Sequence, residues 1–235
     1  MSPGNYETWL DDGQLVCLDS TLPATDKQDI LQSTLYFQLA ASKKVNKLQH
    51  VERWFDAYQN CLRGLGWKVL REGQVQERYP HLLAFTLSDV VQALVRNGLP
   101  IELGDLQQVL PAGGSALTSL GLEHFFQHSF GVLNNSDGPL HQVAIFLSVA
   151  RADACMHGLL IHFKTRQVVS GDITRAIFKC SSLQGEVAAV WLSARPDPWQ
   201  FPDYQEVMTA RLQARTTGEL VRIDRPELRV GKGGE

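Results

Sequence analysis

Two histidines are spaced so that they could bind one ligand together. His124 and His128 lie four residues apart in a stretch, residues 116–130, that is predicted to be helical. Residues at this spacing project from the same face of a helix, as pairs of metal-binding histidines do. The HExxH pattern, which would supply a general base, is absent, and two phenylalanines and a glutamine separate the pair. Because a zinc site needs three or four protein ligands, the sequence favours a structural pair and predicts no metal and no cofactor.

A second candidate for chemistry is the alternating set Asp153, Cys155 and His157. On an extended chain all three side chains would lie on one face. A cysteine paired with a histidine forms a nucleophilic thiolate, and His162 is a further histidine close in sequence. The alternative is a hairpin turn with a small buried thiol. The sequence favours the turn, because cysteine is often buried as a hydrophobic residue.

The run Gly113-Gly114-Ser115 precedes a predicted helix and could offer backbone N–H groups to an anion. It lacks the spacing and the lysine of a phosphate-binding P-loop, so a glycine-rich connection between helices is favoured. The acidic pair Asp11-Asp12, followed by Gly13, is typical of a turn. No pattern in the chain assigns a class of reaction.

Lys43, Lys44 and Lys47 form a compact positive cluster between two predicted helices, with aromatic residues nearby. Lysines beside aromatic residues on amphipathic helices can contact an anionic membrane surface. The alternative is a solvated bend whose lysines are exposed. The sequence favours the bend, since lysine is common at exposed turns.

The elements that would position these residues begin with a helical hairpin, predicted over residues 26–42 and 47–63. The second helix has apolar residues in a three-four alternation, which are Leu48, Val51, Phe55, Tyr58 and Leu62. Such a spacing predicts one continuous apolar face. We expect this face to be an interaction surface if the rest of the chain leaves it open.

Part of the hairpin resembles a known group of proteins. The run from Leu35 to Lys44 contains an Ala-Ala-x-Lys-Lys segment, and Trp54-Phe55 and Leu65-Gly66-Trp67 follow it. This pattern, within residues 35–67, resembles an uncharacterised bacterial protein family. The resemblance implies a bacterial source and transfers no activity or site residue.

The remaining patterns predict an α+β fold. Residues 67–70 and 74–79 read as a hairpin around Arg71-Glu72-Gly73, and apolar, β-branched runs at 141–150 and 156–164 read as a second hairpin. We expect a single domain over residues 1–235, mainly helical over 1–133. Residues 140–220 are predicted to be mainly β, with a small antiparallel sheet and a C-terminal helix, and residues 226–235 to be a disordered tail.

Composition limits the possible functions. The chain has 235 residues and a formal net charge of −3, so it lacks the positive charge typical of proteins that bind nucleic acid. Its four cysteines form no CxxC pair, and no signal peptide is evident, which favours the cytoplasm but leaves leaderless export open.

These observations support three hypotheses. The preferred one is a non-catalytic protein that binds a protein partner or assembles into a homo-oligomer through the apolar face of the hairpin. The first alternative is a membrane-active or exported effector, similar to a toxin, that inserts the same hairpin. The second alternative is an enzyme with a Cys155/His157 or His124/His128 site.

Overall fold

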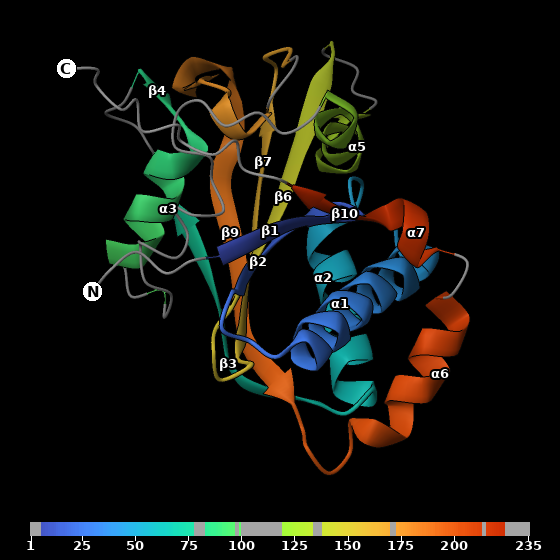
Figure 1. Ribbon diagram of the computed structural model, residues 1–235. Helices are drawn as coiled ribbons and strands as arrows, with labels where there is room; N and C mark the ends of the chain where they lie inside the picture. The colour runs from blue at the N-terminus through green and yellow to red at the C-terminus, as the bar shows by residue number, and fades with distance from the viewer. Residues whose placement is uncertain are drawn as a thin grey trace, which may run out of the picture.

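The computed structural model describes residues 6–77, 83–96, 99, 119–133, 138–169, 173–212 and 215–223. Its centre is a sheet of eight strands in the order β10-β1-β2-β6-β7-β9-β3, with β5 paired to β6 beside that path (Figure 1). The strands are β1 (Tyr6–Asp11), β2 (Gln14–Asp19), β3 (Trp67–Glu77), β5 (Phe130–Leu133), β6 (Leu140–Ala150), β7 (Met156–Thr165), β9 (Leu183–Pro196) and β10 (Leu220–Ile223).

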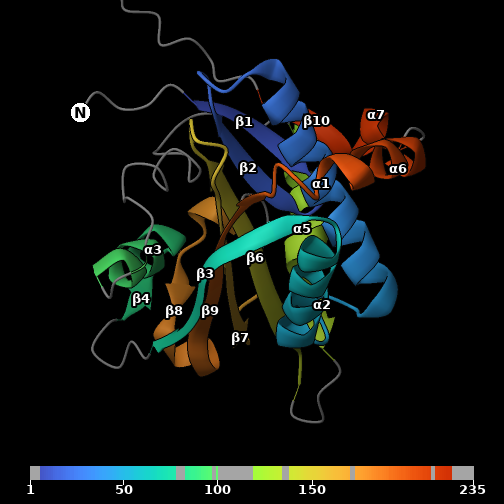
Figure 2. The same cartoon turned by 90° about the horizontal axis from the view of Figure 1, so that it is seen from below.

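Helices cover both faces of this sheet. On one face lie α1 (Ala24–Lys44), α2 (Val51–Gly64) and α6 (Pro202–Leu212), while α3 (Leu87–Arg96) lies on the other (Figure 2). Helix α5 (Ser119–Ser129) packs against β5 and β6, and the short α7 (Thr216–Glu219) leads into β10. Two-residue strands β4 (Ala84–Phe85) and β8 (Phe178–Lys179) pair beside α3, near the 3-10 turns Ile173–Arg175 and Cys180–Ser182. The prediction of an α+β fold is confirmed.

The predicted antiparallel pairing in the C-terminal half is present in β6, β7 and β9, but the prediction of a small sheet confined to that half is wrong. Strands β1, β2 and β3, all from the first third of the chain, join the same sheet as β6, β7 and β9. Strand β2 also runs parallel to β6, with Gln14 opposite Phe146 and Leu18 opposite Ala150. The predicted hairpin of 141–150 and 156–164 is confirmed as β6 and β7.

The turn predicted at Arg71-Glu72-Gly73 is also wrong, because β3 continues straight through it. Gly73 pairs with Trp191 of β9, and a Cβ atom on Gly73 would lie 2.7 Å from the indole ring of Trp191. The glycine therefore makes room for a large cross-strand neighbour, as glycine inside a strand does where another group approaches closely. Sequence patterns do not distinguish this use from a turn.

The apolar face of α2 is buried inside the chain. Val51, Phe55, Tyr58 and Leu62 are each at most 6% exposed, and Leu48 packs on the same core. The rings of Phe55 and Tyr58 contact Phe146 of β6, with centroids 5.9 and 5.1 Å apart. The predicted interaction surface is thus a packing surface against the chain's own sheet. Binding of a protein partner or a second copy stays a prediction and would need another surface.

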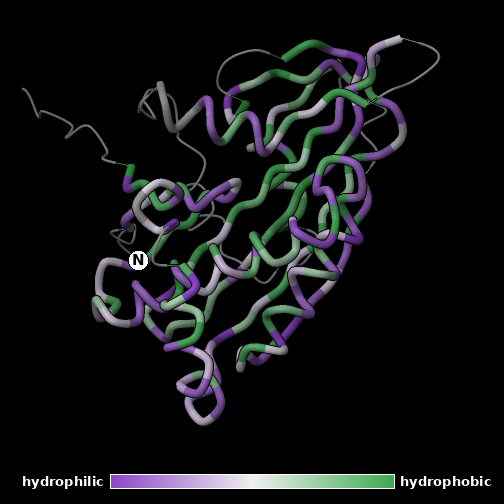
Figure 3. Tube along the Cα trace, turned by 90° about the vertical axis from the view of Figure 1, so that its right-hand side faces the viewer, coloured by the Kyte–Doolittle hydropathy of each residue, from purple (hydrophilic) through white to green (hydrophobic). Residues whose placement is uncertain are grey.

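The hydropathy of the chain follows this layered arrangement. Figure 3 shows long hydrophobic stretches along the strands, whereas the helices alternate between hydrophobic and hydrophilic residues. All eleven residues of β6 are buried, as expected for a central strand covered on both faces. Within the described residues, no helix is long and apolar enough to cross a membrane.

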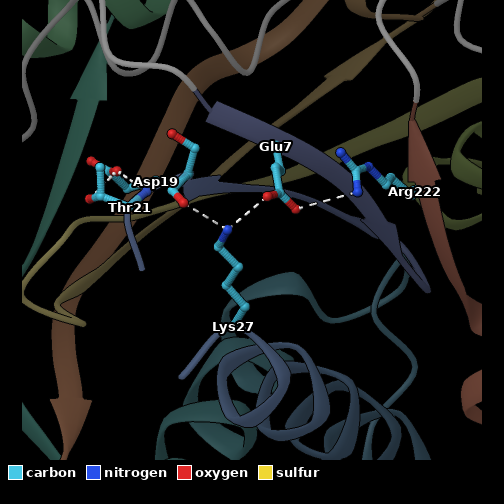
Figure 4. A network of polar contacts seen from close by, with 6 residues as sticks. Glu7, Asp19, Thr21, Lys27 and Arg222 are labelled. Atoms are coloured by element: carbon cyan, nitrogen blue, oxygen red, sulfur yellow. Dashed lines mark hydrogen bonds and ion pairs between the residues drawn. The ribbon is translucent and has the colours of Figure 1, made fainter. Parts of the chain in front are cut away.

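Ion pairs fix the start of α1 to the edge of the sheet. The Lys27 ammonium lies 2.7 Å from a carboxylate oxygen of Glu7 on β1, and it also donates to the carbonyl oxygen of Ser20 (Figure 4). The second carboxylate oxygen of Glu7 lies 3.8 Å from the Arg222 guanidinium on β10. Lys27 lowers the pKa of Glu7, so this carboxylate is ionised at neutral pH. The network orients α1, whose other end forms part of the candidate site.

Candidate metal centre

A cavity of about 430 Å³ lies where four segments distant in sequence meet. The segments are the β1–β2 turn, the end of α1 with the loop to α2, the helix α5, and α7 with the residue before it. Its polar lining includes Asp12, Lys47, His124, His128, Arg215 and Glu219. A volume of this size is within the range of small-molecule sites.

The β1–β2 turn places Asp12 at the cavity. Asp12 has a φ of 49°, which is the left-handed conformation that aspartate tolerates in tight turns. Its backbone N–H donates to the carbonyl oxygen of Glu219 at 3.0 Å, which joins the turn to α7. The residue before it, Asp11, points into the core, where it accepts hydrogen bonds from the side chains of Thr34 and Gln38. The predicted turn is confirmed, and its two carboxylates lie in different environments.

Helix α5 brings both candidate histidines to this turn. The imidazole rings of His124 and His128 have centroids 4.6 Å apart, as their helical spacing predicts. Nδ1 of His124 lies 3.2 Å from the backbone oxygen of Asp12, and Nδ1 of His128 lies 3.6 Å from the carboxylate of Asp12. Phe125, between them, is fully buried and fixes the helix in the core. Burial lowers the pKa of His128, against the attraction of Asp12. The neutral imidazole, which binds metals, is therefore favoured.

These three residues supply a donor set for a metal ion. One ligand atom from each of Asp12, His124 and His128 lies within 4.8 Å of the others. Tetrahedral zinc with bonds of 2.0–2.1 Å separates its ligands by about 3.4 Å, so donors up to 4.8 Å apart need to approach by up to about 1.4 Å. If Nδ1 of His124 donates to the Asp12 carbonyl, the lone pair for the metal is on Nε2. Such a second contact commonly orients a metal-binding histidine.

A further carboxylate supports a cation at this place. One carboxylate oxygen of Glu219, Oε2, is buried and has no hydrogen-bond partner among the described residues. Burial raises the pKa of Glu219, and the negative charge of Asp12 raises it further. A cation between the carboxylates of Asp12 and Glu219 would give the buried oxygen a partner and would reduce the repulsion between the two negative charges.

Lys47 lines the same cavity and is only 9% exposed. The Asn46 side chain accepts backbone hydrogen bonds from Leu48 and Gln49, which shapes the loop around it. The Lys47 ammonium donates to the carbonyl oxygen of Gly13 at 3.2 Å and lies 5.1 Å from the ring centroid of Trp54. Burial lowers the pKa of Lys47 to about 8, against the attraction of Asp12.

The predicted cluster of three exposed lysines is therefore wrong in one member. Lys43 and Lys44 are exposed at the end of α1, whereas Lys47 points inward. The helical break bends the chain so that residue 47 follows the loop into the cavity. An anionic surface would contact only Lys43 and Lys44 in this arrangement.

The environment of Cys155 opposes a nucleophilic thiolate. Burial raises the pKa of Cys155, and the nearby charge of Asp153 raises it further. Asp153 accepts a hydrogen bond from the backbone N–H of Cys155, as in a tight turn, and His157 shares a hydrogen bond with Ser193 on β9 at 2.8 Å. His162, five residues after His157 on β7, projects from the other face of the strand. The predicted turn with a buried thiol is the arrangement present.

The run Gly113-Gly114-Ser115, predicted to connect two helices rather than to bind an anion, lies outside the described residues. Of the sequence candidates, the structure thus groups His124 and His128, and it adds Asp12, Lys47 and Glu219 to them. For Asp12 the sequence predicts only a place in a turn. The only sequence signal for the group was the histidine spacing.

Comparisons with known proteins give structural similarity alone. No protein-family model and no curated protein sequence matches the chain. A solved delta-endotoxin is 14% identical with a TM-score of 0.40, covering 80% of this chain and 82% of its own. Activated Cyt2Ba from Bacillus thuringiensis subsp. israelensis is 13% identical with a TM-score of 0.42, covering 78% of this chain and 96% of its own. The Evf virulence factor is 10% identical with a TM-score of 0.36, and the match covers 86% of this chain and 74% of the Evf chain. Similarity at this level transfers neither an activity nor a site residue to this chain.

Proposed function

We propose that this protein binds a divalent transition metal ion, with zinc as the expected ion, through Asp12, His124 and His128. The observation that supports the proposal is the convergence of three ligand atoms within 4.8 Å at the wall of a cavity. Imidazole and carboxylate ligands suit zinc, and three protein ligands leave a fourth position for water or a ligand. The buried oxygen of Glu219 would serve as a partner of the bound ion or of its water.

The test is a calorimetric titration with Zn²⁺ after the protein has been treated with a chelator. We expect a single ion per chain, and much weaker binding of Mg²⁺, which prefers oxygen ligands in an octahedron. His128→Gln removes a donor at similar volume and should weaken zinc binding by about 100-fold or more, since even partners outside the ligand set contribute 10–100-fold.

His50→Gln is the matched control, because His50 is exposed and does not line this cavity. It should bind zinc with the affinity of the wild type. An equal loss of zinc affinity in His128→Gln and His50→Gln, or no zinc binding by the wild type, would contradict the proposal.

We propose membrane association as a second function, on a separate observation. Trp199, in the turn before α6, is 88% exposed, and Tyr204 and Val207 on α6 are also exposed. This turn lies at the end of the molecule away from α5 (Figure 1). Aromatic residues with a polar edge favour the interface between water and lipid. A membrane-active, toxin-like role would use this surface first, and insertion of the α1–α2 hairpin would require its aromatic face to leave the sheet.

Vesicle co-sedimentation tests this second function. Trp199→Ser should reduce binding to vesicles that contain phosphatidylglycerol by about 30-fold, because burial of a large apolar side chain contributes on the order of 2 kcal/mol. Leu70→Ser, which changes an exposed apolar residue on β3, is the control and should bind as the wild type does. Wild-type protein that stays in the supernatant at low salt would rule out the role.

A further inference from the structure

We propose that the metal centre, together with Lys47 and Arg215, binds a small-molecule oxyanion, which is either a carboxylate or a phosphate monoester. This inference rests on the proposed zinc site, because one oxygen of the anion would occupy the open position on the metal. Lys47 and Arg215 line the same cavity as the three metal donors.

Lys47 is a buried cation that forms no direct ion pair with any described carboxylate. Among the described residues, no carboxylate lies within ion-pair distance of its ammonium, and its protein contacts are the carbonyl of Gly13 and the Trp54 ring. An ammonium has three N–H donors, so the single hydrogen bond to Gly13 leaves two for a ligand. Burying a charge with so few partners is costly, which favours a role in binding.

The charges of the cavity favour an anion once the metal is bound. The carboxylates of Asp12 and Glu219 balance the cations of Lys47 and Arg215, and a divalent ion then adds two positive charges. Arg215 is exposed at the cavity, and its planar guanidinium matches the oxygens of carboxylates and phosphates. Neutral ligands would leave the added charge uncompensated.

The size of the cavity limits the ligand. A volume of about 430 Å³ suits a metabolite-sized molecule. The ligand would place its oxyanion between the metal and Lys47, and the remainder would extend toward Arg215 at the open side. Carboxylate and phosphate share this chemistry, so the experiment compares them.

The experiment uses the full chain loaded with Co²⁺, whose visible absorption spectrum reports changes in the ligands of the metal. Acetate and methyl phosphate are titrated separately at constant ionic strength, with sodium chloride as the reference. We expect at least one of the two oxyanions to change the spectrum in a saturable way and chloride to leave it unchanged. The oxyanion that binds more tightly, acetate or methyl phosphate, identifies the class of ligand.

Three variants assign the effect to the proposed residues. Lys47→Met removes the charge and keeps the length of the side chain. It should weaken binding of the oxyanion by about tenfold or more, while Co²⁺ binding changes little. Arg215→Gln, at an exposed position, should weaken binding of the oxyanion without affecting the fold. Lys43→Met is the matched control, because Lys43 is exposed and does not line the cavity.

The outcomes separate the two proposals. A chain that binds Co²⁺ normally but shows no spectral change with either oxyanion overturns this inference and leaves the metal site intact. A chain that binds no Co²⁺ overturns both. Equal oxyanion affinity in the wild type and in Arg215→Gln and Lys47→Met would also reject the assignment to these side chains.

Discussion

Gly13 lies directly against His128, so that a Cβ atom on Gly13 would be only 2.6 Å from the Cβ of His128. Neither atom is at the end of a flexible chain, so any added carbon must displace α5 or the β1–β2 turn. The absence of a side chain at residue 13 therefore sets the distance between Asp12 and the histidines.

We expect Gly13→Ala to weaken zinc binding although it removes no ligand. Forcing a carbon into a packed contact typically costs about 1–3 kcal/mol, and the displaced helix would carry both histidines away from Asp12. Calorimetric titration with Zn²⁺ should show a loss of about tenfold or more. Gly64→Ala is the control, since no atom lies within 4 Å of the corresponding Cβ position. A Gly13→Ala chain with wild-type affinity would show that this contact does not position the donors.

Zinc should also stabilise the folded chain, because the donors come from elements that only the fold brings together. At a free zinc concentration of 100 times the dissociation constant, binding adds about 2.7 kcal/mol to the free energy of unfolding. For a chain of this size that raises the midpoint temperature by about 5–10 °C. Differential scanning fluorimetry measures the shift, which His128→Gln should abolish. An equal shift in that variant would place the zinc elsewhere.

The aromatic cluster beneath α2 should dominate the stability of the helical layer. The Phe146 ring contacts Trp54, Phe55 and Tyr58, and Phe146 is fully buried. Phe146→Ala should lower the free energy of unfolding by about 3–5 kcal/mol, as loss of a buried phenylalanine does elsewhere. Chemical denaturation measures this, and Trp199→Ala, at an exposed position, should change stability by less than about 0.5 kcal/mol. A small effect of Phe146→Ala would mean that the layer is held by other contacts.

His162 should make stability depend on pH. Burial lowers the pKa of His162 below its ordinary value of 6.5, against the attraction of Glu52. Above pH 6.5 both the folded and the unfolded chain keep this imidazole neutral. As the pH falls through 6.5, the unfolded chain takes up a proton that the folded chain resists, so stability is lost.

Denaturation at pH 7.5 and pH 5.5 tests this dependence. His162→Gln does not titrate and should lose less stability than the wild type over that interval. His50→Gln, at an exposed site, should behave as the wild type. Identical pH profiles for the wild type and His162→Gln would contradict the assignment.

Local patterns predicted the local elements of this fold. The three-four alternation predicted the second helix of the hairpin, and the run from residue 141 to residue 164 predicted β6 and β7. These elements depend on spacing and on short-range turns, which the chain displays directly. The turn predicted at Gly73 was wrong because local patterns do not show distant neighbours. The Trp191 ring, which requires a glycine at residue 73, lies 118 residues away in the sequence.

The candidate site could be predicted only in part. The helix spacing paired His124 with His128, yet nothing in the sequence linked them to Asp12, which is 112 residues earlier. Lys47 was predicted to be exposed because lysine usually is, and only the loop bounded by Asn46 shows why it is not. The positions of residues from several elements depend on the order of the strands in the sheet. The periodicity of apolar residues does not predict that order.

The parallel pairing of β2 with β6 has a consequence for synthesis of the chain. Strand β2 ends at Asp19, whereas its partner begins at Leu140, so the β1–β2 hairpin leaves the ribosome long before its neighbour exists. Pairings between such distant segments form slowly, and an unpaired strand edge is prone to aggregation. Asp12, at the tip of that hairpin, meets Glu219 only after more than 200 residues have been made. The site therefore closes only late in the synthesis of the chain.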